Sequence, residues 1–153
     1  MDTQFSTPEE EVAYLHSQLR DKVERSKGFE GRITKEDNAR EVVREYREAP
    51  VEKVISSQMQ MQAGEKHRLI EWLSPSETDD QVSMLAQVMA DKGIKNAFIM
   101  AQELNSPIVE DDFERFLVQY LLSGHEIKNN LSKDEWKSLH MKLFEVVLPE
   151  GTE

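Results

Sequence analysis

The hydrophobic positions of this chain recur at the three- and four-residue spacing of amphipathic helices. Five stretches carry such apolar stripes, which centre on Val12 to Val23, Val82 to Met89, Ile94 to Ala101, Phe113 to Leu121 and Trp136 to Val147. Strict alternation is confined to residues 58–62, and no Asn-Gly or Asp-Gly hairpin turn occurs. The pattern therefore predicts an all-α protein, an antiparallel helical bundle or a short solenoid of α-hairpins, with about six to eight helices.

Helix starts are marked by a Ser or Thr followed three residues later by an acidic residue, because both side chains can bond to amides of the first turn. This pattern begins at Thr7, Thr34, Ser74 and Ser132. It predicts helices that begin near residues 8, 35, 75 and 133.

Helix ends are marked by Gly or Asn, which tolerate the left-handed conformation found after many helices. The marks are Gly28, Gly64, Gly93, Asn105 and Gly124. They predict a helix over residues 51–63 that ends at Gly64, with a strand over the Gln/Met stretch as the alternative. A short helix follows and ends before Ser74.

The two halves of the chain differ in character. Residues 1–63 read as charge-rich amphipathic helices and residues 64–153 as a compact helical core, and we expect both to form one folding unit. The large side chains assigned to the core are Trp72, Phe98, Phe113, Phe116, Tyr120, Trp136 and Phe144.

Charge and composition narrow the classes of function. The 153 residues include 30 acidic and 19 basic side chains, which gives a formal charge of −11. The electrostatic field of a chain with this net negative charge repels the phosphate backbone of DNA or RNA, so we expect no nucleic-acid partner. The absence of cysteine excludes disulfides, thiolate nucleophiles and cysteine-ligated metals. With no signal peptide and no apolar run near 20 residues visible, we expect a cytoplasmic protein without direct membrane insertion.

Motifs for catalysis are missing from the sequence. Neither phosphate-binding glycine loop, nor a Gly-x-Ser-x-Gly turn, nor a His-Glu-x-x-His metal motif occurs. We therefore expect a non-enzymatic chain with no catalytic residues, no metal and no cofactor. The alternative is a metal-dependent enzyme or regulator in which Glu71 or Asp112 converges with His67 or His140.

Two sets of residues are candidates for binding a protein partner. The acidic residues Glu110, Asp111, Asp112 and Glu114 form a docking surface that favours a basic partner. The second set is an apolar seam of Tyr14, Leu15 and Leu19 within a charged helix, which is typical of helix docking or of self-association into a homo-oligomer. The sequence thus predicts a protein–protein interaction or assembly module.

Residues 74–150 also carry a resemblance, in the order of four segments. These are Leu73 to Glu77, Asp91 to Ala97, Leu104 to Pro107 and Asp111 to Leu121. The region resembles a helical region of type IV secretion (conjugation)-like proteins of uncultured bacteria. Because that region has no catalytic motif of its own, the resemblance implies a role in assembly rather than in chemistry.

Overall fold

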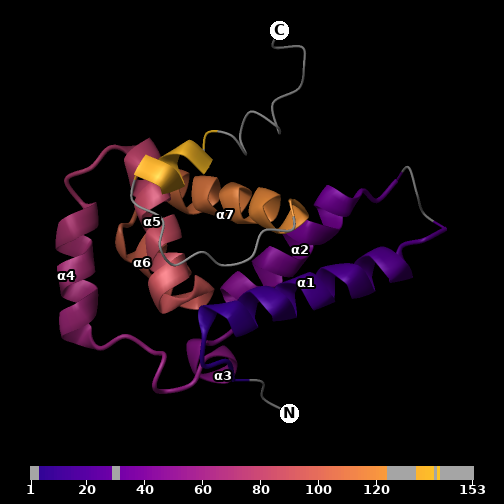
Figure 1. The fold of residues 1–153 in the computed structure, drawn as a ribbon, viewed down its shortest axis with the longest axis horizontal. Helices are drawn as coiled ribbons and strands as arrows, with labels where there is room; N and C mark the ends of the chain where they lie inside the picture. Colours follow the sequence, from indigo (N-terminus) through magenta and orange to yellow (C-terminus); the bar gives the residue numbers. More distant parts are fainter. Residues whose placement is uncertain (1–3, 29–31, 124–133, 140, 142–153) are drawn as a thin grey trace, which may run out of the picture.

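Helices account for almost all regular structure in the chain. The computed structural model describes residues 4–28, 32–123, 134–139 and 141. Its helices are α1 (Pro8–Arg25), α2 (Lys35–Glu48), α3 (Val51–Val54), α4 (Ala63–Leu73), α5 (Thr78–Lys92), α6 (Ile94–Glu103) and α7 (Pro107–Leu122) (Figure 1). Residues 134–139 and 141 are also helical. The described ranges hold one isolated bridge, Phe5 to Ile55, and no strand. The all-α prediction is confirmed.

Local capping explains the two helix starts that were predicted correctly. Thr7 accepts a hydrogen bond from the Glu10 amide at the start of α1. At the start of α2, Thr34 accepts from the Asp37 amide at 3.0 Å and the Asp37 carboxylate accepts from the Thr34 amide at 3.0 Å.

The predicted start near residue 75 is wrong. α4 runs to Leu73, Ser74 keeps a helical backbone as its C-cap, and α5 begins only at Thr78. A further helix was predicted to begin near residue 133. Its expected cap, Ser132, lies outside the described residues, and residues 134–139 are helical.

The helix ends were predicted with mixed success. Gly93 ends α5 with φ of 109°, and Asn105 follows α6 with φ of 59°, which confirms both marks. Gly28 lies in the turn after α1, also with positive φ. Gly64 is a correction, because it lies in the first turn of α4 rather than after a helix. Gly124 falls outside the described residues.

The predicted helix over residues 51–63 is also wrong. α3 ends at Val54, and Ile55 is extended beside Phe5, whose carbonyl accepts from the Ser56 amide at 2.9 Å. Further along, the Met59 carbonyl accepts from the Asn96 side chain at 2.8 Å. These long-range contacts outweigh the helix propensity of Gln and Met and hold the segment in turns.

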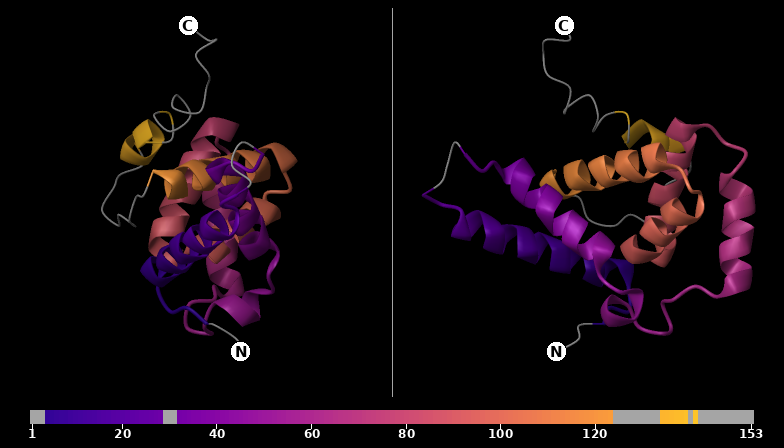
Figure 2. Two further views of the ribbon diagram at one scale, coloured as in Figure 1. Left: turned by 90° about the vertical axis from the view of Figure 1, so that its right-hand side faces the viewer. Right: turned by 180° about the vertical axis from the view of Figure 1, so that it is seen from behind.

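The helices enclose one apolar core. α1 and α2 form a hairpin, α7 packs along α2, and α5 and α6 pack on each other and on α7 (Figures 1 and 2). Aromatic rings run through this core, with Phe98 and Phe113 centroids 5.1 Å apart and Phe116 and Tyr120 centroids 5.7 Å apart. The core contains residues from both 1–63 and 64–153.

Five of the seven assigned core side chains are buried as predicted, namely Phe98, Phe113, Phe116, Tyr120 and Trp136. Trp72 is a correction, because 43% of it is exposed. Its helix, α4, contacts mainly α6, so only a narrow stripe that ends in Leu73 is covered. Phe144 lies outside the described residues.

A buried carboxylate joins three helices in this core. Glu11 of α1 accepts hydrogen bonds from the Tyr46 hydroxyl at 2.6 Å, the Ile94 amide at 2.6 Å and the Lys95 amide at 3.0 Å. It therefore caps α6, whose own N-cap residue, Gly93, has no side chain. Burial raises the pKa of Glu11 to about 7 despite these three donors.

Candidate docking site

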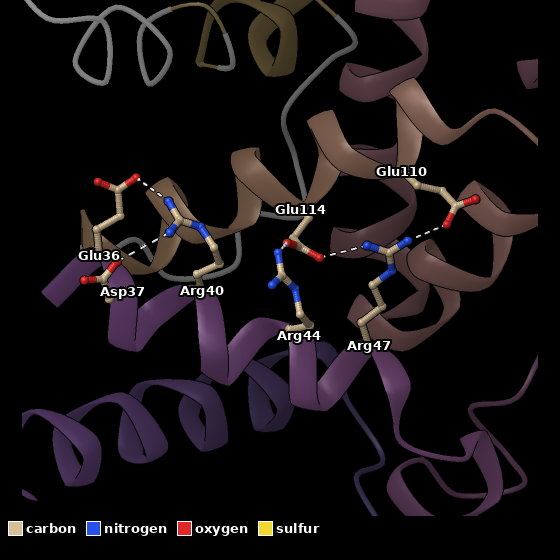
Figure 3. Close-up of polar contacts among 7 residues, drawn as sticks. All are labelled: Glu36, Asp37, Arg40, Arg44, Arg47, Glu110 and Glu114. Carbon is tan, nitrogen blue, oxygen red and sulfur yellow. Dashed lines mark hydrogen bonds and ion pairs between the residues drawn. The ribbon is translucent and has the colours of Figure 1, made fainter. Parts of the chain in front are cut away.

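The acidic cluster of α7 lies against α2 rather than in open solvent. Glu114 accepts from Arg44 at 2.9 Å and from Arg47 at 2.8 Å, and Arg47 also bonds to Glu110 (Figure 3). Glu114 is nearly buried, with 7% of its side chain exposed. Two of the four predicted docking carboxylates are therefore used to hold α2 on α7.

The other two carboxylates of the predicted surface are also placed among basic groups. Asp112 pairs with Arg115 at 3.4 Å on the same helix. Asp111 lines a hollow of about 310 Å³ between α2 and α7, which also contains Arg40, Arg44 and Arg115. This face mixes both signs of charge, and the docking of a basic partner on these four carboxylates stays a prediction.

Removing the charge of Glu114 is expected to loosen the contact between α2 and α7. In Glu114→Gln the two guanidinium groups lose their shared carboxylate, which should lower the free energy of unfolding by about 2 kcal/mol. Urea denaturation measures this loss. Asp112→Asn is the matched control, because its pair with Arg115 is local to one helix and should be worth under about 0.5 kcal/mol. Equal effects of the two substitutions would contradict this interpretation.

The apolar seam of α1 faces inward. Leu15 and Leu19 are buried in the core, and Tyr14 is half-buried with its ring 5.1 Å from that of Phe5 and 6.1 Å from that of Tyr46. The hypothesis that these three residues dock a partner required the remaining helices to pack without α1. In this fold α1 packs on α2 and on α5 to α7, so Leu15 and Leu19 serve the core, and the docking role of the seam stays a prediction.

Among the named helices of ten or more residues, α4 has the fewest buried side chains. α4 lies at the left edge of the molecule in Figure 1 and at the right edge in the right-hand view of Figure 2, which is turned by 180°. Of its 11 residues Leu73 alone is buried, although the sequence of α4 also contains Leu69, Ile70 and Trp72. A helix of this length is marginal by itself in water, so contacts at its two ends matter.

Two polar contacts tie α4 to α5, one near each end. Glu65 in the first turn of α4 pairs with Lys92 in the last turn of α5. The Leu73 carbonyl at the end of α4 accepts from the Gln81 side chain near the start of α5 at 3.0 Å. The two helices therefore run antiparallel and are held at a fixed separation.

Between these ties lies a hollow of about 270 Å³. Its walls are Leu69 and Trp72 from α4 and Gln87, Val88, Asp91 and Lys92 from α5. The Gln87 Oε1 atom is buried and has no hydrogen-bond partner among the described residues. A buried acceptor without a donor costs about 1–3 kcal/mol. We refer to this feature as the α4–α5 hollow.

Sequence reasoning missed this hollow. Trp72 was expected to face the core, and Gln87 and Asp91 carried no motif. The sequence did contain one indication, because Trp72 comes directly before Leu73, the last residue of the helix. Neighbouring side chains on a helix point about 100° apart, so both cannot pack against the same narrow strip of another helix.

The residues of the metal-dependent alternative do not gather into a site within the described ranges. His67 and Glu71 form an exposed pair at 3.2 Å on α4, Asp112 lies on α7, and His140 is outside the description. No group of three or more potential metal-ligating side chains occurs in that part of the chain. Nor does any helix described there have the length and apolar character needed to cross a bilayer.

Comparison with protein-family models, with curated proteins and with solved structures finds no match to this chain. The resemblance of residues 74–150 to type IV secretion-like proteins stays a prediction. The function is therefore argued from the geometry of this structure.

Proposed function

We propose that this chain is a protein–protein interaction module that binds its partner through the α4–α5 hollow. The observation that carries the proposal is the exposed Trp72 beside the hollow between α4 and α5. The apolar surface of this tryptophan lacks contacts in the isolated chain. A partner side chain that enters the hollow would cover it.

Energetic considerations favour this face over others. Tryptophan is enriched among the residues that dominate protein interfaces, where its truncation often costs 2 kcal/mol or more. The ties from Glu65 to Lys92 and from Gln81 to Leu73 hold the walls in place before binding. A preformed site loses little conformational entropy when the partner arrives.

The acidic face of α7 and the seam of α1 support this function less directly. Their key groups already make contacts inside the chain, so a partner would have to replace those contacts. Binding at the α4–α5 hollow breaks none of the contacts described above.

Replacing Trp72 should abolish partner binding without unfolding the chain. The tagged full chain, its Trp72→Ala variant and an Ile108→Ala variant are used to capture proteins from the native cell. Ile108 is the matched control, because it is 64% exposed and lies on α7 away from the hollow. A partner retained by the wild type and Ile108→Ala but lost with Trp72→Ala is expected, with unchanged helical circular dichroism for all three. Retention of the same proteins by Trp72→Ala would contradict the proposal.

A further inference from the structure

A second hollow lies on a different part of the molecule. Figure 1 shows the last turns of α7 beside the hairpin of α1 and α2, and a hollow of about 500 Å³ lies there. Its described lining shares no residue with that of the α4–α5 hollow. We propose that this α1–α7 hollow binds one fatty-acid anion, with the carboxylate on Arg20 and Lys35 and the hydrocarbon chain on Val23 and Leu122.

Three helices build the walls of the α1–α7 hollow. One face of α1 forms the longest wall, because its lining positions recur at three- and four-residue spacing. α7 supplies Leu121 and Leu122, and α2 supplies its first residue, Lys35. The end of α7 meets the start of α2 because the two helices run antiparallel, and the Gln119 side chain contacts Glu36 there at 3.5 Å.

The apolar part of the lining suits a hydrocarbon chain. Leu19 and Leu121 are buried in the core, whereas Val23 and Leu122 pack against that core and are only half-buried. A hydrocarbon chain laid on these two side chains would extend the core outward. Each methylene that becomes fully buried tightens binding about fourfold. The volume lies within the range of about 300–1,000 Å³ that is typical of small-molecule sites.

The charged part of the lining favours an anion. Arg20, Lys27 and Lys35 are cations and Glu24 is the one acid among the described lining residues, so their formal charge is +2. Glu24 pairs with Lys27 at 2.9 Å. Arg20 and Lys35 are exposed and have no ion-pair partner within the described part of the chain. One carboxylate can accept charge-assisted hydrogen bonds from both of these cations.

The net charge of the chain restricts the size of the anion. At a formal charge of −11, the field of the whole protein repels an anionic membrane or an extended acidic protein surface. A single carboxylate responds mainly to the cations beside it, because charges further away than about 8–10 Å are screened at physiological salt. The ligand that fits has one anionic head and one apolar chain.

The probe for this site is dodecanoate, titrated below its critical micelle concentration into the full-length protein with isotopically labelled methyl groups. We expect one saturable site that shifts the methyl signals of Val23 and Leu122 and leaves those of the exposed Ile108 unchanged. Octanoate, which is four methylenes shorter, should bind at least about tenfold more weakly. Dodecyltrimethylammonium has the same chain with a cationic head, and it should not saturate the site.

Two double variants with the same change of charge separate the hollow from the general field. Arg20→Gln/Lys35→Gln should weaken the binding of dodecanoate about tenfold, because both partners of the carboxylate are lost. The matched control is Arg68→Gln/Lys53→Gln, which changes two exposed cations outside the hollow and should leave the affinity unchanged. Equal effects of the two variants, equal binding of the ammonium, binding only by micelles, or no shift of the two methyl signals would each overturn the proposal.

Discussion

Replacing Glu11 with alanine is expected to lower the free energy of unfolding by about 4 kcal/mol. The substitution leaves the Tyr46 hydroxyl and the amides of Ile94 and Lys95 buried without their acceptor. Each unsatisfied group costs about 1–3 kcal/mol, and removal of a buried charge offsets part of the sum. Since small domains are stable by only about 5–15 kcal/mol, this single change removes a large share.

Urea denaturation of Glu11→Ala at neutral pH measures this loss. Glu24→Ala is the matched control on the same helix, because Glu24 forms an exposed ion pair with Lys27 and its substitution should change stability by less than about 0.5 kcal/mol. A loss below about 1 kcal/mol for Glu11→Ala would show that the carboxylate does not hold α1, α2 and α6 together.

The same carboxylate makes stability depend on pH. Its folded pKa is raised from 4.5 to about 7, so the folded state binds more protons than the unfolded state between these values. This contribution to stability is fully present below pH 4.5 and is lost as the pH rises through 7. The difference amounts to about 3 kcal/mol. Glu11→Gln removes the titration, so the wild type should gain stability relative to this variant between pH 8 and pH 5.

Gly93→Ala is expected to cost about 3 kcal/mol, the second largest effect. Gly93 has φ of 109° and ψ of 160°, a region that is essentially restricted to glycine. A Cβ atom there would also lie 2.6 Å from Oε1 of Glu11 and would overlap the Met59 side chain. The added carbon therefore both strains the backbone and displaces the cap of α6.

Gly28→Ala separates these two causes, because Gly28 also has a positive φ, 98°, while its Cβ would meet no atom of the described residues within 4 Å. Its substitution should cost only the backbone strain, about 1 kcal/mol. Thermal or urea unfolding compares the variants. Equal losses at the two glycines would mean that crowding of Glu11 contributes nothing.

The parts of the fold that could be predicted from sequence are those set by neighbours in the chain. The starts of α1 and α2 depend on Thr7 and Thr34, whose side chains bond three residues away. The end of α5 depends on Gly93, which alone tolerates its backbone angles. Such signals need no knowledge of tertiary structure.

The remainder depends on contacts between distant residues. Ile55 is extended because Phe5 lies beside it, and Glu11 is stable in the core because donors more than 80 positions later reach it. Its one sequence clue was its place on the same helical stripe as Leu15 and Leu19. Likewise, Trp72 was assigned to the core from its apolar character alone, whereas its exposure follows from how little of α4 the other helices cover.

The central claim is that a protein partner binds at the α4–α5 hollow. Its most direct test is photo-crosslinking in the native cell, with p-benzoylphenylalanine placed at position 68, one turn before Trp72 on α4, and, as the control, at position 108. The account predicts an adduct with a different protein from position 68 and none from position 108. An adduct with that protein from position 108 alone, with none from position 68, or an adduct only with a second copy of this chain, would contradict it.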